Sequence, residues 1–248
     1  MKPVHFLYFF LVLVSCKNDA SKLTKITAKT IAIDSSIAPS TKIVRLIAPY
    51  KEKLIGEMET VLSYTPKAIT KKSVAMQSSL GNLMADMCFE MSADLFAEKT
   101  NTGIDFAMFN YGGLRANIAA GAVTKEEAFK LMPFENELVV VNLSAKKVVA
   151  LVQYFIENKK AHPLSKNIAL RIKAKEFQLQ INGKKFDTNK TYNVLTSDYL
   201  QEGGDKMDFF KNPEKLTRLD YKVRAAVLHY FEKVDTLKTA IDTRVIIE

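Results

Sequence analysis

Asn110-Tyr-Gly-Gly-Leu-Arg115 is the stretch on which the interpretation of the fold depends, because it places two glycines between an amide and a guanidinium. It follows an alternating apolar run, Ile104-Asp-Phe-Ala-Met-Phe109, which predicts a half-buried strand. Adjacent glycines after a strand favour a sharp turn with positive φ and a close approach of the backbone to another group. Asn110 and Arg115 offer the hydrogen-bond donors that suit a sugar or a phosphate. From these residues alone, an ordinary turn and a ligand-binding loop both stay open.

A second pair of adjacent glycines, Gly203 and Gly204, follows another predicted strand at 191–196. Because each glycine turn comes after a strand, both turns can lie at the same edge of a sheet. Tyr199 stands just before the second pair, and Asp205 directly follows it. Two interpretations of Tyr199 are open, an aromatic that stacks on a ligand and a core aromatic that closes the strand.

Apolar periodicity on either side of these turns predicts one mixed α/β (α+β) domain at 41–248, in which mixed sheets are layered with helices. Ser78 or Ser79 is expected to cap a helix, Ser144 another, and the capping-box spacing of Thr124-Lys-Glu-Glu127 a brief third helix. Asn182-Gly183 predicts a tight hairpin. The expected helices are 43–58, 80–97, 124–132, 144–156 and 223–234, and the further strands are 30–33, 60–64, 138–143, 168–172, 177–181 and 243–247.

The composition fits a globular chain with a sizeable core. The chain has 248 residues, of which 48% are hydrophobic, and its formal net charge is +9, from 36 basic and 27 acidic residues. The lysines are spread along the chain with no aromatic-interleaved basic stripe, so a nucleic-acid polymer is not an expected partner. The charge predicts a solvated surface with a mild attraction for anions.

The N-terminus predicts an address in the bacterial cell envelope. Lys2 and the apolar run at 6–14 are typical of a secretory signal, and Leu13-Val-Ser-Cys16 resembles a lipobox. We therefore expect a lipoprotein signal peptide at 1–15, a lipid on Cys16 that anchors the chain to a membrane, and a tether at 16–40. An uncleaved membrane anchor is the alternative. The other cysteine, Cys88, lies on an apolar helical face, which predicts core packing and no disulfide.

Five stretches in matching order resemble the C-terminal, substrate-binding domain of the 5′-nucleotidase family. The resemblance covers about residues 41–248. It implies a layered α/β fold that holds the nucleoside part of a nucleotide, with Asn110, Gly113, Arg115 and Asp205 in contact with the ligand and Tyr199 stacked on the base. The stretches are Leu80-Gly-Asn-Leu-Met-Ala-Asp86, Asn110-Tyr-Gly-Gly-Leu-Arg115, Gly121-Ala-Val-Thr124, Pro133-Phe-Glu-Asn136 and Tyr199-Leu-Gln-Glu-Gly-Gly-Asp205.

Two departures from the family pattern predict weaker nucleotide binding. The segment after the helix that follows Pro133-Phe134 lacks the second aromatic expected from the family, unless His162 substitutes for it. The family also carries an arginine several residues before the Leu80 motif. The corresponding position here lies near Val74, and no arginine is found there.

The catalytic half of the family is also missing from the sequence. Hydrolysis there needs a metallophosphatase domain with two metal ions, and such a site needs a cluster of His, Asp and Asn ligands. This chain has three histidines, with no clustered ligand motif and no arrangement typical of nucleophilic catalysis. We therefore expect no catalytic residue, metal site or cofactor in this chain, and divalent metals only in a partner.

Three functional hypotheses follow from the resemblance. The first is the substrate-binding component of a 5′-nucleotidase-type hydrolase, with catalysis supplied by a separate metallophosphatase chain at the same membrane. The second is a lipid-anchored module that binds a nucleoside or another small ligand without a catalytic role. The third is a structural remnant whose site has decayed.

Overall fold

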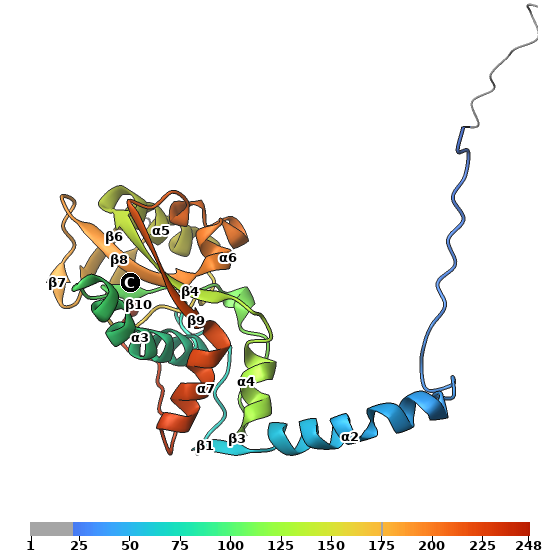
Figure 1. The fold of residues 1–248 in the computed structure, drawn as a ribbon. Coiled ribbons are helices and arrows are strands. Elements are labelled where there is room, and N and C mark those ends of the chain that lie inside the picture. The colour runs from blue at the N-terminus through green and yellow to red at the C-terminus, as the bar shows by residue number, and fades with distance from the viewer. Residues whose placement is uncertain (1–21, 175) are drawn as a thin grey trace, which may run out of the picture. The chain divides into compact units, whose positions relative to one another are not determined.

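The computed structural model describes residues 22–174 and 176–248 (Figure 1). It divides into two units, and the boundary along the chain lies between Ala48 and Pro49. The predicted signal peptide and the lipidation site at Cys16 lie outside the described residues. The predicted strand at 30–33 is wrong, because these residues are irregular and exposed. A strand needs a neighbour for its backbone hydrogen bonds, and the tether supplies none among the described residues.

Helix α2 (Thr41–Met58) begins where the sequence predicted that regular structure would start. Its apolar residues follow helical spacing, yet none of its 18 described residues is buried, and Pro49 lies inside it. No helix among the described residues is long and apolar enough to span a bilayer.

The second unit is built around a four-stranded sheet in the order β2-β8-β4-β9. Strand β4 runs antiparallel to β8 without a break, from Leu138 opposite Ser197 to Ser144 opposite Thr191. Strand β2 is parallel to β8 and shorter than its alternating pattern predicted, while β9 at the other edge was not predicted. The strands are β2 (Phe106–Ala107), β8 (Thr191–Ser197), β4 (Glu137–Ser144) and β9 (Lys215–Lys222).

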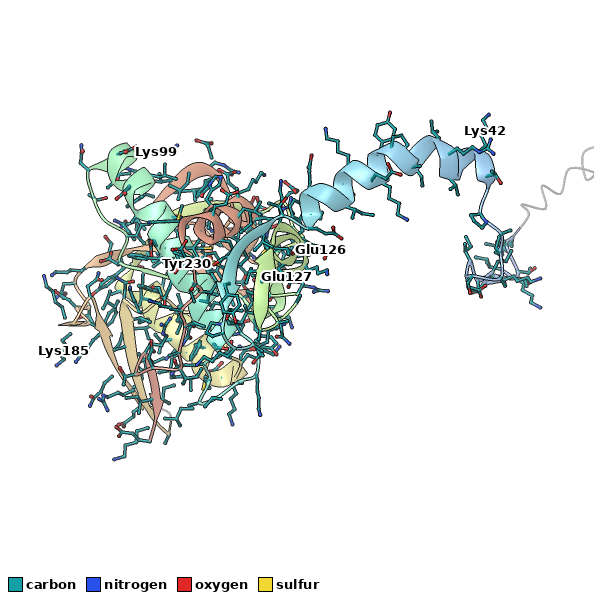
Figure 2. The ribbon with its side chains drawn as sticks, turned by 90° about the horizontal axis from the view of Figure 1, so that it is seen from below. Lys42, Lys99, Glu126, Glu127, Lys185 and Tyr230 are labelled. Atoms are coloured by element: carbon teal, nitrogen blue, oxygen red, sulfur yellow. The ribbon has the colours of Figure 1, made fainter. Side chains whose placement is uncertain are left out.

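Both faces of this sheet are covered, because successive side chains of β4 point to opposite sides. Leu138 and Val140 join a core with α3 (Ser79–Thr100), α4 (Lys125–Leu131) and α7 (Val223–Lys233). Val139 and Val141 join a second core with α5 (Ala145–Asn158). Figure 1 shows α3 and α7 on one side of the sheet and α5 on the other. In Figure 2, Lys99 marks the end of α3 and Tyr230 lies on the neighbouring α7.

A second four-stranded sheet, in the order β10-β5-β6-β7, completes the layer on the α5 side. The predicted hairpin is confirmed, since Asn182 and Gly183 join β6 to β7 with φ values of 50° and 71°. Figure 2 labels Lys185, which lies on β7. The mixed α/β prediction is therefore confirmed. The strands are β10 (Val245–Ile247), β5 (Ile168–Lys173), β6 (Glu176–Ile181) and β7 (Lys184–Lys185), and a small antiparallel pair is formed by β1 (Val61–Thr65) and β3 (Gly121–Thr124).

The predicted helix starts are right in position and only partly right in mechanism. Ser78 caps α3, its hydroxyl accepting a hydrogen bond from the backbone N–H of Gly81 at 3.0 Å. Thr124 and Ser144 precede α4 and α5 as expected, but neither side chain makes a capping bond. Glu126, also at the start of α4 (Figure 2), forms an ion pair with Lys130 one turn later, at 2.7 Å.

Candidate functional site

The two glycine turns meet at a cavity of about 270 Å³. The first turn is a single turn of 3₁₀ helix, Tyr111–Gly113, which follows β2. The second lies between α6 (Asp198–Gln201) and another short 3₁₀ helix, Gly204–Lys206. The polar residues on the cavity are Asn110, Arg115, Asn136, Ser197, Tyr199 and Asp205, and its apolar walls include Met84, Phe109, Leu114, Met132, Phe134 and Val223.

The first turn brings the backbone close to the side chain of Asn110. The N–H of Gly113 donates to the carbonyl of Asn110 at 3.2 Å. A Cβ on Gly113 would lie 2.7 Å from Oδ1 of Asn110, whereas one on Gly112 would make only van der Waals contacts at 3.4 Å. The expected close approach is therefore found at Gly113. The expected positive φ is not, because neither glycine of this turn has one.

The backbone of the second turn lies close to the ring of Tyr199. Gly203 has φ of 91°, and a Cβ on Gly204 would lie 2.4 Å from two ring carbons of Tyr199. Asp205 also adopts a positive φ, 53°, which is uncommon for a residue with a side chain. Tyr199 is 45% exposed on the cavity, so the interpretation of Tyr199 as a core aromatic is wrong.

Hydrogen bonds join the two turns, although their residues lie 95 positions apart. The Asn110 side-chain amide donates to one carboxylate oxygen of Asp205 at 2.7 Å. The Tyr199 hydroxyl donates to the other oxygen at 3.1 Å. Three residues predicted from sequence therefore meet at the carboxylate of Asp205, and two others, Gly113 and Arg115, line the same cavity.

Arg115 gives one wall of the cavity a positive charge. Its guanidinium makes no ion pair with any described residue and lies 5.8 Å from the ring centroid of Phe134. Nearby, the Nζ of Lys71 donates to the carbonyl of Leu114 at 2.5 Å and lies 4.1 Å over the ring of Tyr111. Burial and then the charge of Arg115 lower the pKa of Lys71. Lys71 was not singled out from the sequence, because only folding brings it under this turn.

Phe134 supplies a second aromatic on the cavity, where it is 39% exposed. The family's second aromatic was expected in the segment after α5, and no residue of that segment lines the cavity, so Phe134 provides this ring from a different part of the chain. Phe134 belongs to a stretch already quoted for the resemblance, but it was not singled out there as a residue of the site. An aromatic directly after Pro133, where the proline ends the predicted helix at 124–132, is the sequence signal that could have found it.

His162 does not line the cavity and cannot be the second aromatic wall. It is only 4% exposed, and its Nδ1 accepts a hydrogen bond from the backbone N–H of Tyr111 at 3.1 Å. Burial, followed by the charge of Lys160, lowers the pKa of His162 to about 4. The imidazole is therefore neutral at neutral pH, and its hydrogen bond to Tyr111 holds the backbone of the first turn.

The other residues considered in the sequence do not line the cavity. Val74 forms a short bridge with Gln77 and is absent from the lining of the cavity. His229 contacts the hydroxyl of Tyr221 at 2.7 Å, and Cys88 is buried in the core, where burial raises the pKa of its thiol. Within the described residues, no group of three or more His, Cys, Asp or Glu side chains could hold a metal ion.

Comparison with known proteins relates these features to a family. A family model described as "5'-nucleotidase, C-terminal domain" matches residues 55–212. Protein UshA of Escherichia coli (strain K12) is 24% identical over 212 residues, which cover 83% of this chain and 37% of UshA. Cell wall protein Lmo0130 of Listeria monocytogenes is 24% identical over 210 residues, which cover 75% of this chain and 26% of Lmo0130.

Solved structures share the fold. The crystal structure of a 5'-nucleotidase precursor from Thermus thermophilus aligns with a TM-score of 0.65 at 20% identity, covering 85% of this chain and 44% of that one. The chain thus spans less than half the length of each of these three proteins.

Proposed function

The chain belongs to the family of the 5′-nucleotidase C-terminal domain, and from this membership we propose that it is the substrate-binding component of a 5′-nucleotidase-type phosphoester hydrolase. Its ligand is a nucleoside or a nucleotide. A separate metallophosphatase chain supplies the catalytic step and the divalent metals that this step needs. The alternative is a lipid-anchored module that binds such a ligand without any catalytic role.

The observation that carries the proposal is the joining of two distant turns around one carboxylate, with aromatic rings on the same cavity. Tyr199 and Phe134 offer faces on which a base can stack, because every base has a π-face. The carboxylate of Asp205 can accept hydrogen bonds from sugar hydroxyls, and Arg115 can donate to phosphate or carbonyl oxygens. The volume of about 270 Å³ is near the lower end of about 300–1,000 Å³ for small-molecule pockets.

One observation motivates a separate catalytic partner. The given sequence has no cluster of ligands for two metal ions, which this hydrolysis needs. A phosphoester bond held in this cleft would need such a cluster from elsewhere. The lipobox at Cys16 would place the protein on a membrane of the cell envelope, and a relative named a cell wall protein supports an envelope location.

Calorimetry with adenosine, AMP and uridine on the full chain tests the binding role. Wild type should bind, while Tyr199→Ala and Arg115→Ala should each bind more weakly. Equal binding by wild type and both variants would locate the site elsewhere. Purification from the native membrane separates the first two hypotheses, since a co-purifying metallophosphatase supports the split enzyme and binding without one supports the module. Absence of binding even with such a partner would favour the remnant.

A further inference from the structure

Two side chains that do not line the cavity form hydrogen bonds with the backbone of its two turns. Tyr154 lies near the end of α5, and His162 lies in the segment that follows this helix. Nδ1 of His162 accepts from the backbone N–H of Tyr111 at 3.1 Å, and the hydroxyl of Tyr154 donates to the backbone carbonyl of Asp205 at 2.8 Å. The two rings pack on each other, with centroids 5.5 Å apart. One Tyr–His pair therefore contacts both turns.

The bond to His162 fixes the first turn through its backbone. Tyr111 is the first residue of the 3₁₀ helix, so its N–H has no partner within that helix. Neutral imidazole can accept at Nδ1 only when its proton is on Nε2, and Nε2 is buried without a hydrogen-bond partner among the described residues. The ring therefore makes its one hydrogen bond to the turn that carries Asn110 and Gly113.

The bond to Tyr154 fixes the second turn at its most strained point. Asp205 and Lys206 both have positive φ, 53° and 61°, which residues with side chains adopt only when their surroundings enforce it. The hydroxyl of Tyr154 contacts the backbone of Asp205, so the carboxylate stays free for Asn110 and Tyr199. Phe209 packs edge-on against the ring of Tyr154, at 5.4 Å, and limits its movement.

We propose that Tyr154 and His162 are positioning residues, which set the separation of the two turns and so the affinity of the cleft, although neither touches the ligand. The inference rests on the proposed function, since it assumes a nucleoside or nucleotide between the turns. It assigns to the half-buried Tyr154 and the buried His162 the task of aligning Asn110 and Asp205, which lie 95 positions apart.

The chain provides a matched control pair. Tyr221 and His229 have centroids 5.6 Å apart, their polar atoms are 2.7 Å apart, and neither lines the cavity. Tyr154→Phe and His162→Leu each remove one bond to a turn, while His162→Asn keeps an acceptor near the position of Nδ1. Tyr221→Phe and His229→Leu make equivalent changes away from the cleft.

Each variant would be made in the full chain, purified in detergent, and titrated with adenosine and AMP by calorimetry. Loss of one hydrogen bond to a turn should weaken binding about 5- to 10-fold for Tyr154→Phe and His162→Leu. His162→Asn should recover affinity to within about threefold of wild type, and the control variants should match wild type. Wild-type affinity in Tyr154→Phe and His162→Leu would overturn the inference, as would an equal loss in the controls.

Hydrogen exchange at the Tyr111 amide gives a readout that needs no ligand. The amide should be protected in wild type and His162→Asn and exchange faster in His162→Leu, whereas equal protection in all three contradicts the role of His162. Should wild type bind neither adenosine nor AMP, the proposed function fails, and the exchange pattern alone decides whether the pair positions the turns. If His162→Leu does not fold, Tyr154→Phe and His162→Asn still carry the test.

Discussion

Gly204→Ala is expected to remove the aromatic platform of Tyr199 without removing the tyrosine. A Cβ on Gly204 would lie 2.4 Å from two ring carbons of Tyr199 and 2.6 Å from a third, where ordinary contacts begin at 3.4 Å. The ring must therefore move by about 1 Å or more. The backbone itself should tolerate alanine, since φ at Gly204 is not positive.

The expected magnitude follows from the contact that is lost. Stacking of a base on an aromatic side chain contributes about 1–3 kcal/mol, which at about 1.4 kcal/mol per factor of ten corresponds to an affinity about 5- to 150-fold weaker. Extra atoms forced into a packed site lower the free energy of unfolding by about 1–3 kcal/mol when neighbouring groups cannot move away. Because Tyr199 is 45% exposed and can swing outward, we expect the cost in unfolding free energy near the lower limit.

Calorimetry with adenosine measures the loss, and thermal unfolding of the same samples shows whether the variant is folded. Gly112→Ala is the matched control, because its Cβ would make contacts of 3.4 Å on the same cavity. Wild-type affinity in a folded Gly204→Ala protein would refute the role of Tyr199. Equal losses in the two variants would show that any added methyl group blocks the cleft.

Four further predictions follow. Phe134→Ala should weaken adenosine binding by about 1–3 kcal/mol in calorimetry, because it removes the other aromatic face, while Phe134→Tyr should not; unchanged affinity in Phe134→Ala would contradict this role. Arg115→Lys should weaken AMP binding more than adenosine binding in paired titrations, because an ammonium cannot reproduce the bidentate guanidinium; equal losses would place Arg115 away from the phosphate. Burial lowers the folded-state pKa of His162 from 6.5 to about 4, so between these pH values the unfolded chain binds a proton that the folded chain does not. Stability from this group is then complete above about pH 6.5 and falls by about 3 kcal/mol toward pH 4, which denaturant titrations of wild type and His162→Asn measure; parallel pH profiles would contradict it. Mass spectrometry of membrane-extracted protein should find a diacylglyceryl group on Cys16 as the first residue, and a mature chain that begins elsewhere would exclude the lipobox.

Local signals predicted much of the fold. Ser78 was identified as a possible cap because its hydroxyl acts within three residues, and Asn182-Gly183 because a tight hairpin needs two residues with positive φ. Strand β9 escaped prediction because it is an edge strand in which only Leu219 is buried, so its charged residues hid the alternation. Residues 30–33 show the opposite error, since a β-prone run forms no strand without a partner.

The site residues that belong to a sequence motif could be predicted. Those that reach the site only through tertiary packing could not. Asn110, Tyr199 and Asp205 stood beside glycine pairs, and the structure brings them together. The structural role of His162 could not be predicted from its neighbours in sequence, because its hydrogen-bond partner is a backbone N–H 51 positions away. Phe134 was not singled out, because its motif shows that an aromatic is present without showing that this ring reaches the cleft.

The bonds between Asn110, Tyr199 and Asp205 occupy one acceptor position on each oxygen of the carboxylate before any ligand arrives. A ligand hydroxyl must share these oxygens with donors at 2.7 and 3.1 Å, or displace one of them. Affinity at this point then measures the difference between two sets of hydrogen bonds, each worth about 0.5–1.5 kcal/mol net. A molecule that lacks the matching hydroxyl leaves the internal bonds intact, so it loses an advantage but incurs no penalty for an unpaired charge. The cleft should therefore discriminate only modestly among nucleosides that differ at one sugar hydroxyl, and its selectivity should come from the rings that enclose the base.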